Sequence, residues 1–197
     1  MKKIIIVALC ALPFFAQAQN VVREDFDSNT LGWNEISSKR YSAIIQDGVL
    51  HLETREKADF AIASCYDLID VRNPFEISIK IVNTKIDDEE RGIGIVFNYL
   101  DDFNFDAFTL SKEEVRYQRF YENKLVGQRS GEIKFDKKQK DHELVIKSGY
   151  NRLEFFVNGV KAIDMRNIPL TYSGFGLIVW SADGKYAADI DYIEFKQ

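Results

Sequence analysis

The stretch that decides the fold is Arg152-Leu153-Glu154-Phe155-Phe156-Val157-Asn158-Gly159, near the end of a chain of 197 residues. A similar apolar run, residues 144–147, precedes it, and two more follow at 176–180 and 190–195. Asn-Gly between two such runs is typical of a type I′ hairpin, because both central positions of that turn need positive φ. Short apolar runs separated by turn residues predict an all-β chain, folded as an antiparallel β-sandwich.

The rest of the chain shows the same pattern of short strands and turns. Asp47-Gly48 predicts a second tight hairpin. Isoleucine occupies every second position from Ile77 to Ile81, which is typical of a strand with one face buried and one face in water. The predicted strands are 21–26, 41–46, 49–54, 60–66, 75–82, 92–99, 103–110, 115–121, 124–128, 142–147, 152–157, 160–165, 174–180 and 188–196.

The first eighteen residues read as a secretory signal. Lys2 and Lys3 form a positive start, residues 4–15 form an apolar run too short to cross a bilayer, and Ala16-Gln17-Ala18 is a small-x-small cleavage pattern. Cleavage after Ala18 leaves 19–197 as a single β-sandwich domain, placed in the periplasm or outside the cell. Lipidation at Cys10 and an uncleaved membrane anchor are the alternatives.

Charge and composition narrow the class of function. The net charge of −5 falls to −7 once the two lysines of the signal leave, which disfavours binding to a nucleic-acid backbone. No later segment approaches the roughly 18 apolar residues of a membrane span, so the mature chain is expected to have none. Cys65 would be the only cysteine left, so no internal disulfide is expected, and we interpret it as a small buried hydrophobe.

Several short motifs recur in an order that points to one superfamily. They are Asp25-Phe26-Asp27 with Gly32-Trp33, then Asp47-Gly48-Val49-Leu50-His51-Leu52, Phe75-Glu76-Ile77-Ser78-Ile79, Gly92-Ile93-Gly94-Ile95-Val96-Phe97, Phe155-Phe156-Val157-Asn158-Gly159 and Asp191-Tyr192-Ile193-Glu194-Phe195. Taken together, the chain resembles the concanavalin A-like lectin/glucanase (laminin G-like) jelly-roll superfamily. It is also similar in style to the secreted β-sandwich proteins abundant in Bacteroidetes.

The resemblance implies binding of glycans outside the cytoplasm or, in some branches, their hydrolysis. The hydrolase branch carries a Glu-x-Asp-x-x-Glu strand, and the nearest match here is Asp189-Ile190-Asp191-Tyr192-Ile193-Glu194. This match begins with aspartate and lies on the last strand of the chain. We therefore predict a polar outer strand face there, and no catalytic residue.

A ligand site is predicted between residues 99 and 121, where aromatic and polar residues are mixed. Sugars stack their C–H faces on aromatic rings while polar groups bind their hydroxyls, so both residue types are needed together. The residues proposed for this site are Tyr99, Asp102, Asn104, Tyr117, Arg119 and Tyr121, with Trp180 near Asp183 and Tyr186 as a second cluster.

Alternation along the strand divides the predicted site into two triplets. Tyr117, Arg119 and Tyr121 share one face of the strand. The other face holds Arg116, Gln118 and Phe120. We favour the first triplet as the one that faces a groove; the alternative is that these aromatics belong to the core.

A structural calcium is the only cofactor that the resemblance implies. Related jelly rolls often hold one near their paired terminal strands, and the candidate ligands here are Asp25, Asp27, Asp189 and Asp191. Calcium takes six to eight oxygen ligands, so other groups would have to contribute.

Three functions are compatible with these residues. We favour a secreted, non-catalytic binding module for carbohydrate. A protein–protein interaction module of the cell envelope is the main alternative, and a divergent glycoside hydrolase is a third. The expected partner is a glycan or an envelope protein.

Overall fold

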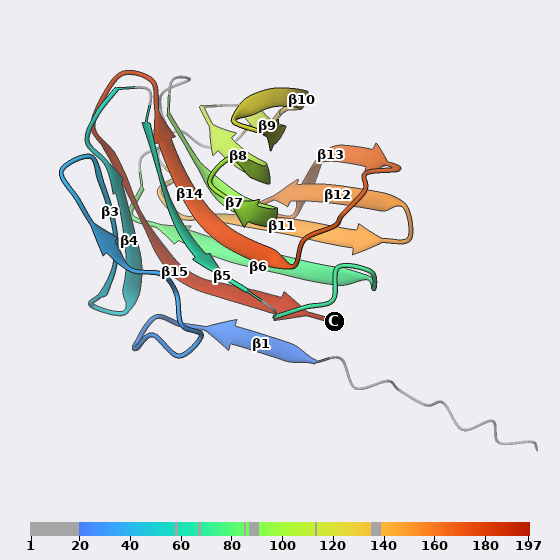
Figure 1. The fold of residues 1–197 in the computed structure, drawn as a ribbon, viewed down its shortest axis with the longest axis horizontal. Helices are drawn as coiled ribbons and strands as arrows, with labels where there is room; N and C mark the ends of the chain where they lie inside the picture. The colour runs from blue at the N-terminus through green and yellow to red at the C-terminus, as the bar shows by residue number, and fades with distance from the viewer. Residues whose placement is uncertain are drawn as a thin grey trace, which may run out of the picture.

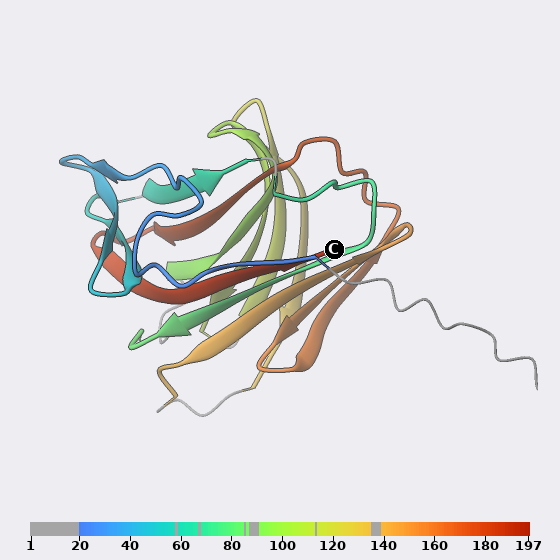
Figure 2. The same cartoon turned by 90° about the horizontal axis from the view of Figure 1, so that it is seen from below.

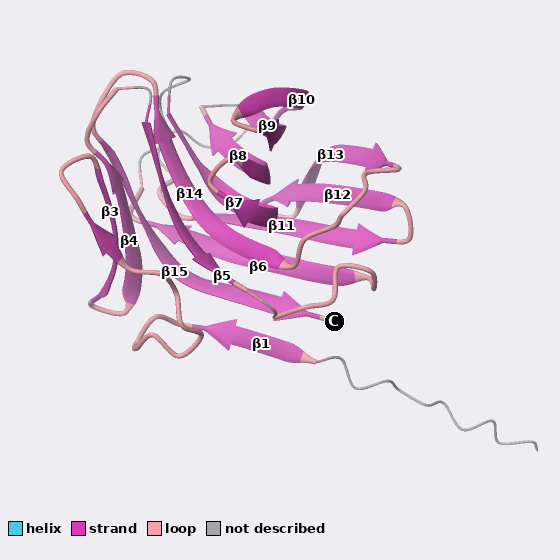
Figure 3. Cartoon of the chain, viewed as in Figure 1, coloured by secondary structure: helices cyan, strands magenta, loops and turns pink. Residues whose placement is uncertain are grey.

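The computed structural model describes residues 20–57, 59–66, 68–84, 86, 91–112, 114–134 and 139–197. The predicted signal segment and Cys10 lie outside these ranges. Strands joined by loops make up the described chain (Figure 3). Nowhere in the described ranges is there a helix long and apolar enough to cross a membrane.

Each predicted strand is present, with ends that shift by up to four residues. The short β2 was missed by the sequence analysis. The strands are β1 (Val21–Glu24), β2 (Ile36–Ser37), β3 (Tyr41–Gln46), β4 (Val49–Thr54), β5 (Asp59–Cys65), β6 (Phe75–Val82), β7 (Arg91–Asp101), β8 (Asn104–Ser111), β9 (Glu114–Tyr121), β10 (Lys124–Glu132), β11 (His142–Gly149), β12 (Arg152–Val157), β13 (Val160–Arg166), β14 (Gly174–Ser181) and β15 (Tyr186–Lys196).

The strands form two antiparallel sheets that pack face to face (Figures 1 and 2). One sheet has the order β13-β12-β11-β6-β15-β4-β3-β2, with β1 also paired to β15, and the other has the order β10-β9-β8-β7-β14-β5. The two ends of the described chain lie side by side, because Asn20 and Gln197 exchange backbone hydrogen bonds of 2.7 and 2.9 Å. The predicted antiparallel β-sandwich is confirmed.

Both predicted hairpin turns have the expected backbone. Asn158 and Gly159 have φ of 50° and 77°, and Asp47 and Gly48 have φ of 53° and 74°. Positive φ at both central residues is the signature of a type I′ turn, whose twist matches that of the flanking strands. These turns join β12 to β13 and β3 to β4.

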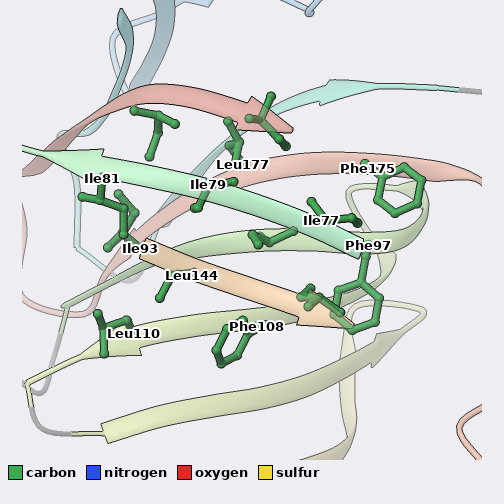
Figure 4. Close-up of a cluster of buried hydrophobic side chains, with 14 of the residues drawn as sticks. Ile77, Ile79, Ile81, Ile93, Phe97, Phe108, Leu110, Leu144, Phe175 and Leu177 are labelled. Carbon is green, nitrogen blue, oxygen red and sulfur yellow. The ribbon is translucent and has the colours of Figure 1, made fainter. Parts of the chain in front are cut away.

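The core lies between the sheets and is filled by side chains from one face of most of the strands (Figure 4). The isoleucines of β6 that alternate in sequence are all fully buried. They meet residues of the opposite sheet that include Phe97 and Phe108. Phe155 packs its ring 4.7 Å from that of Phe108 and 6.0 Å from that of Phe97, measured between centroids. Cys65 also lies in this core, as predicted, and burial raises the pKa of its thiol to about 12.

Replacing Phe155 by alanine should destabilise the sandwich strongly. The side chain is fully buried, so its removal leaves a cavity between the sheets. We expect a loss of about 3–5 kcal/mol in the free energy of unfolding, measured by chemical denaturation. Phe156 is the matched control, because it points to the outer face and lies beside Lys147. An equal loss for Phe156→Ala would contradict this account of the core.

A second stability prediction concerns His142, which is 1% exposed. Burial lowers the pKa of its imidazole, so the folded state favours the neutral ring. Above about pH 6.5, the pKa of the ring in the unfolded chain, the ring is neutral in both states and its burial does not lower stability. As the pH falls below about 6.5, the unfolded chain binds a proton that the folded state does not, so the free energy of unfolding decreases. We expect His142→Asn to flatten the pH dependence of the unfolding free energy between about pH 7 and pH 5. An unchanged slope would refute the assignment to His142.

Candidate functional site

The two outer faces of the sandwich differ in chemistry. On the nine-stranded sheet, charged side chains are paired across strands, as Lys147 is with Glu76 at 2.8 Å and Lys80 with Asp191 at 3.2 Å. The outer face of the six-stranded sheet instead gathers apolar side chains into a second cluster. Its members are Ile62, Val96, Tyr99, Phe105, Ala107 and Ile178, with Phe60 and Phe120 packed against them.

A pocket of about 370 Å³ opens on this apolar face. Its volume falls in the range of about 300–1,000 Å³ that is usual for small-molecule sites. Its lining residues come from β5, β8, β9, β14 and the loops that follow β9 and β14. They are Phe60, Phe105, Ala107, Thr109, Arg116, Gln118, Phe120, Asn123, Ile178, Trp180, Ser181 and Ala182.

Strand β9 supplies one wall of the pocket through every second residue. Val115 and Tyr117 point into the core, so alternation turns Arg116, Gln118 and Phe120 outward. The antiparallel register sets each of the three directly opposite a pocket residue of β8. These cross-strand pairs are Arg116 with Thr109, Gln118 with Ala107, and Phe120 with Phe105.

Trp180 forms the other end of the pocket, and its indole packs directly against Gly92. Its cross-strand partners are Phe60 on β5 and Gly92 on β7. A Cβ atom added to Gly92 would lie 2.1 Å from Trp180 Nε1, so only glycine lets the indole lie against β7. The guanidinium carbon of Arg116 is 5.5 Å from the centre of the Trp180 ring. The indole therefore sits between the sheet and a cation.

The pocket combines aromatic rings with polar groups that are held in place. Phe105 and Phe120 stack with ring centroids 4.8 Å apart, and Phe60 meets Phe105 edge-on at 6.3 Å. Arg116 donates a hydrogen bond of 2.9 Å from Nε to Glu114 Oε2. That contact lowers the pKa of the Glu114 carboxyl, which therefore stays ionised and fixes the guanidinium beside the pocket.

The expectation that Tyr117, Arg119 and Tyr121 face a groove together is wrong. Tyr117 is 3% exposed and lies in the core, with its ring centroid 5.9 Å from that of Phe155. The residues that face outward are Arg116, Gln118 and Phe120. Val115 and the large Tyr117 ring, on the other face of β9, are both buried between the sheets. Tyr121, at the end of β9 beyond the core, is 57% exposed.

Arg119 is held in an ion pair at the end of the sandwich. Its Nε and Nη2 atoms each donate a 2.6 Å hydrogen bond to the fully buried carboxylate of Asp106, and Nη2 also donates to Pro169 O at 2.9 Å. These bonds raise the pKa of Arg119. Asn98, with φ of 49°, donates to the same carboxylate and accepts hydrogen bonds from the backbone N–H groups of Thr171 and Tyr172. The network ties the 167–172 loop to the sheet.

The other predicted ligand residues mostly stabilise this end of the fold. Tyr99, at 6% exposure, donates from its hydroxyl to Asp102 Oδ1 at 2.7 Å. Asn104 donates to Asp101 Oδ1 at 2.8 Å, within the turn between β7 and β8. Trp180 alone of the predicted residues lines the main pocket. Asn104, Arg119 and Tyr121 line a smaller neighbouring pocket of about 180 Å³, which shares Phe105 and Phe120 with the main one.

The four aspartates named for calcium are not gathered into a site. Asp25 pairs with Arg23 at 2.7 Å, Asp189 with His51 at 2.6 Å and Asp191 with Lys80 at 3.2 Å. Across the described ranges, no group of three or more His, Cys, Asp or Glu side chains is placed to hold a metal ion. Asp25 and Asp191 are instead paired with cations, and Asp189 with the imidazole of His51.

The partial hydrolase motif lies on the opposite side of the molecule from the pocket. Asp189, Asp191 and Glu194 belong to β15 in the nine-stranded sheet, and Glu194 pairs with Lys196 at 2.7 Å. Each carboxylate has a cationic or imidazole partner, as expected for a polar outer strand face.

Comparison with known proteins identifies the fold. No protein-family model and no curated protein matches the chain. Its structure is similar to the carbohydrate recognition domain of Emp47p, with a TM-score of 0.61, 13% identity, and coverage of 83% of this chain and 87% of that one. It is also similar to the carbohydrate-binding module CBM66 from Bacillus subtilis, with a TM-score of 0.53, 16% identity, and coverage of 83% and 93%.

A third similar structure is the β-glucanase of Bacillus licheniformis, with a TM-score of 0.61, 12% identity, and coverage of 91% of this chain and 99% of that one. At such identities the likeness shows the fold alone. The chain therefore has the concanavalin A-like jelly-roll fold, which it shares with this carbohydrate recognition domain, this carbohydrate-binding module and this β-glucanase.

The place of Trp180 can be tested through the glycine beneath it. Gly92→Ala should push the indole off β7 and red-shift the tryptophan fluorescence, because the other tryptophan, Trp33, is 2% exposed and stays in the core. Gly149→Ala is the control, since an added Cβ there meets nothing within 4 Å. Unchanged emission from the Gly92 variant would show that the indole does not rest on this strand.

Proposed function

We propose that the chain is an exported, non-catalytic carbohydrate-binding module whose ligand lies in the pocket on the outer face of the six-stranded sheet. The observation that supports this most directly is the set of rings over that face, bordered by Arg116, Gln118 and Asn123. Sugar rings stack on aromatic faces, and their hydroxyls need donors and acceptors at the edge of the stack.

The structural neighbours support a glycan as the ligand. Two of them are by name a carbohydrate recognition domain and a carbohydrate-binding module. Because one fold hosts many functions, the weight of the proposal rests on the pocket and not on the likeness.

Among the described residues, the pocket lacks the pair of carboxyl groups that hydrolysis would need, which favours binding without hydrolysis. Its lining, as far as the chain is described, includes no aspartate or glutamate, whereas a retaining glycosidase needs two carboxyl groups about 5 Å apart. Glu114, the neighbouring carboxylate, is ionised and bonded to Arg116, so it is poorly suited to act as an acid. Export to the periplasm or the exterior is supported by the predicted signal segment.

A glycan array followed by calorimetry on the best ligand tests the proposal. Truncating a ring that a sugar stacks on typically costs about 2 kcal/mol, so Trp180→Ala and Phe120→Ala should each weaken binding at least about tenfold. Tyr121→Ala is the matched control, because it removes an exposed ring from the residue next to Phe120 without touching the main pocket.

The outcomes separate three explanations. Loss of binding in the two pocket variants alone supports the site and the function together. Loss in Tyr121→Ala alone moves the ligand to the smaller pocket at the end of the sheet. A folded protein that binds no glycan contradicts carbohydrate binding and favours a protein partner.

A further inference from the structure

Arg116 is the only charged residue among the described residues that line the main pocket. The other polar residues of the lining are Thr109, Gln118, Asn123 and Ser181. Their hydroxyl and amide groups can both donate and accept hydrogen bonds, whereas a guanidinium has N–H donors only. Any ligand atom that bonds to Arg116 must therefore be an acceptor.

One edge of the Arg116 guanidinium is occupied by the protein itself. Nε donates a hydrogen bond of 2.9 Å to Glu114 Oε2, and Nη2 donates to the same oxygen. Glu114 stays ionised, because this contact lowers the pKa of its carboxyl, and it holds the guanidinium in one orientation. On another side, the guanidinium carbon lies 5.5 Å from the centre of the Trp180 ring. Arg116 is therefore positioned before a ligand binds.

The other edge of the guanidinium, formed by Nη1 and the second N–H of Nη2, is left open. No described group accepts a hydrogen bond from Nη1, and 19% of the Arg116 side chain is exposed. Two N–H groups at one edge of an arginine match two oxygens of an oxyanion, as in the bidentate pairs that arginine forms with carboxylates and phosphates. Because the side chain is already fixed, little conformational entropy is lost when both bonds form.

We propose that the glycan bound in this pocket is acidic, and that its oxyanion accepts hydrogen bonds from the open edge of Arg116 while a sugar ring packs on Trp180. This inference rests on the proposed function and specifies the class of glycan. The oxyanion is the carboxylate of a uronic acid or the sulfate ester of a sulfated sugar, since both present paired oxygens. Glu114 compensates part of the charge of Arg116, so the selectivity depends mainly on the fit of the two hydrogen bonds.

A glycan array built from matched pairs tests the class of ligand. Each uronic-acid glycan is printed beside its carboxyl-reduced form, and each sulfated glycan beside its desulfated form. The protein should bind the acidic member of a pair at least about tenfold more tightly than the neutral one, because hydrogen bonds to charged groups are the stronger ones. The kind of pair that shows this preference distinguishes a carboxylate from a sulfate.

The failure of this inference differs from the failure of the proposed function. Strongest binding to neutral glycans, or equal binding to both members of the pairs, overturns the acidic ligand and leaves carbohydrate binding intact. A folded protein that binds no glycan of either kind contradicts carbohydrate binding itself, and the acidic ligand with it.

A pair of arginine variants assigns the preference to one side chain. Arg116→Gln keeps a donor but removes the charge and the forked edge, so the acidic and neutral members of a pair should bind equally well. Arg129→Gln is the matched control, because Arg129 is exposed on the neighbouring strand β10, opposite the core residue Tyr117, and does not line the pocket. It should keep the preference of the parent protein. A preference that persists in Arg116→Gln, or is lost in Arg129→Gln, overturns the role of Arg116.

Discussion

Strand β9 must bury one of its faces between the two sheets, and the position of the site follows from this constraint. In β9, Val115 and Tyr117 fill the space under the sheet and contact the core around Phe155. Their neighbours Arg116 and Gln118 are thereby directed outward into the pocket. A shift of one residue in the register would exchange the two sets, so the packing of the core and the chemistry of the outer face are decided together.

The two outer faces of the sandwich differ in the kind of side chains that they carry. The nine-stranded sheet exposes paired charges, each contributing about 0–1 kcal/mol, and needs no further cover. The six-stranded sheet has an apolar cluster on its outer face, and no further layer of strands from the described part of the chain packs on that face. The six members of this cluster are buried, and the partly buried Phe60 and Phe120 pack against them. Ligand binding at Trp180 and Phe120 would complete the burial of those rings.

A buried polar network stabilises the end of the sheet next to this face. Asp106 is fully buried and would be costly to leave unpaired, so its two hydrogen bonds with Arg119 are required for stability. Asn98 extends the network to the 167–172 loop. In the sequence, Arg119 lies among aromatic residues, a pattern that predicts ligand binding. Its partner is instead the aspartate directly opposite on β8, a pairing that depends on strand register.

The sequence by itself determined the elements and their class. Asn158-Gly159 and Asp47-Gly48 specify their turns through local backbone conformation, and alternation such as that of Ile77 to Ile81 specifies a strand with one buried face. Both signals act over a few neighbouring residues, so they can be read without the fold. Trp180 is also predicted for the ligand site from its polar neighbours in sequence, and it lines the main pocket.

Only the tertiary structure decided which face of β9 points outward and which strands adjoin it. Phe60, Phe105 and Trp180 are far apart in the chain and meet because β5, β8 and β14 lie in one sheet. Alternation gives two equivalent faces, and aromatic residues occur on both faces of β9, so local pattern cannot choose between them. The choice is made by the volume available between the sheets, which is a property of strand order and packing across the whole molecule.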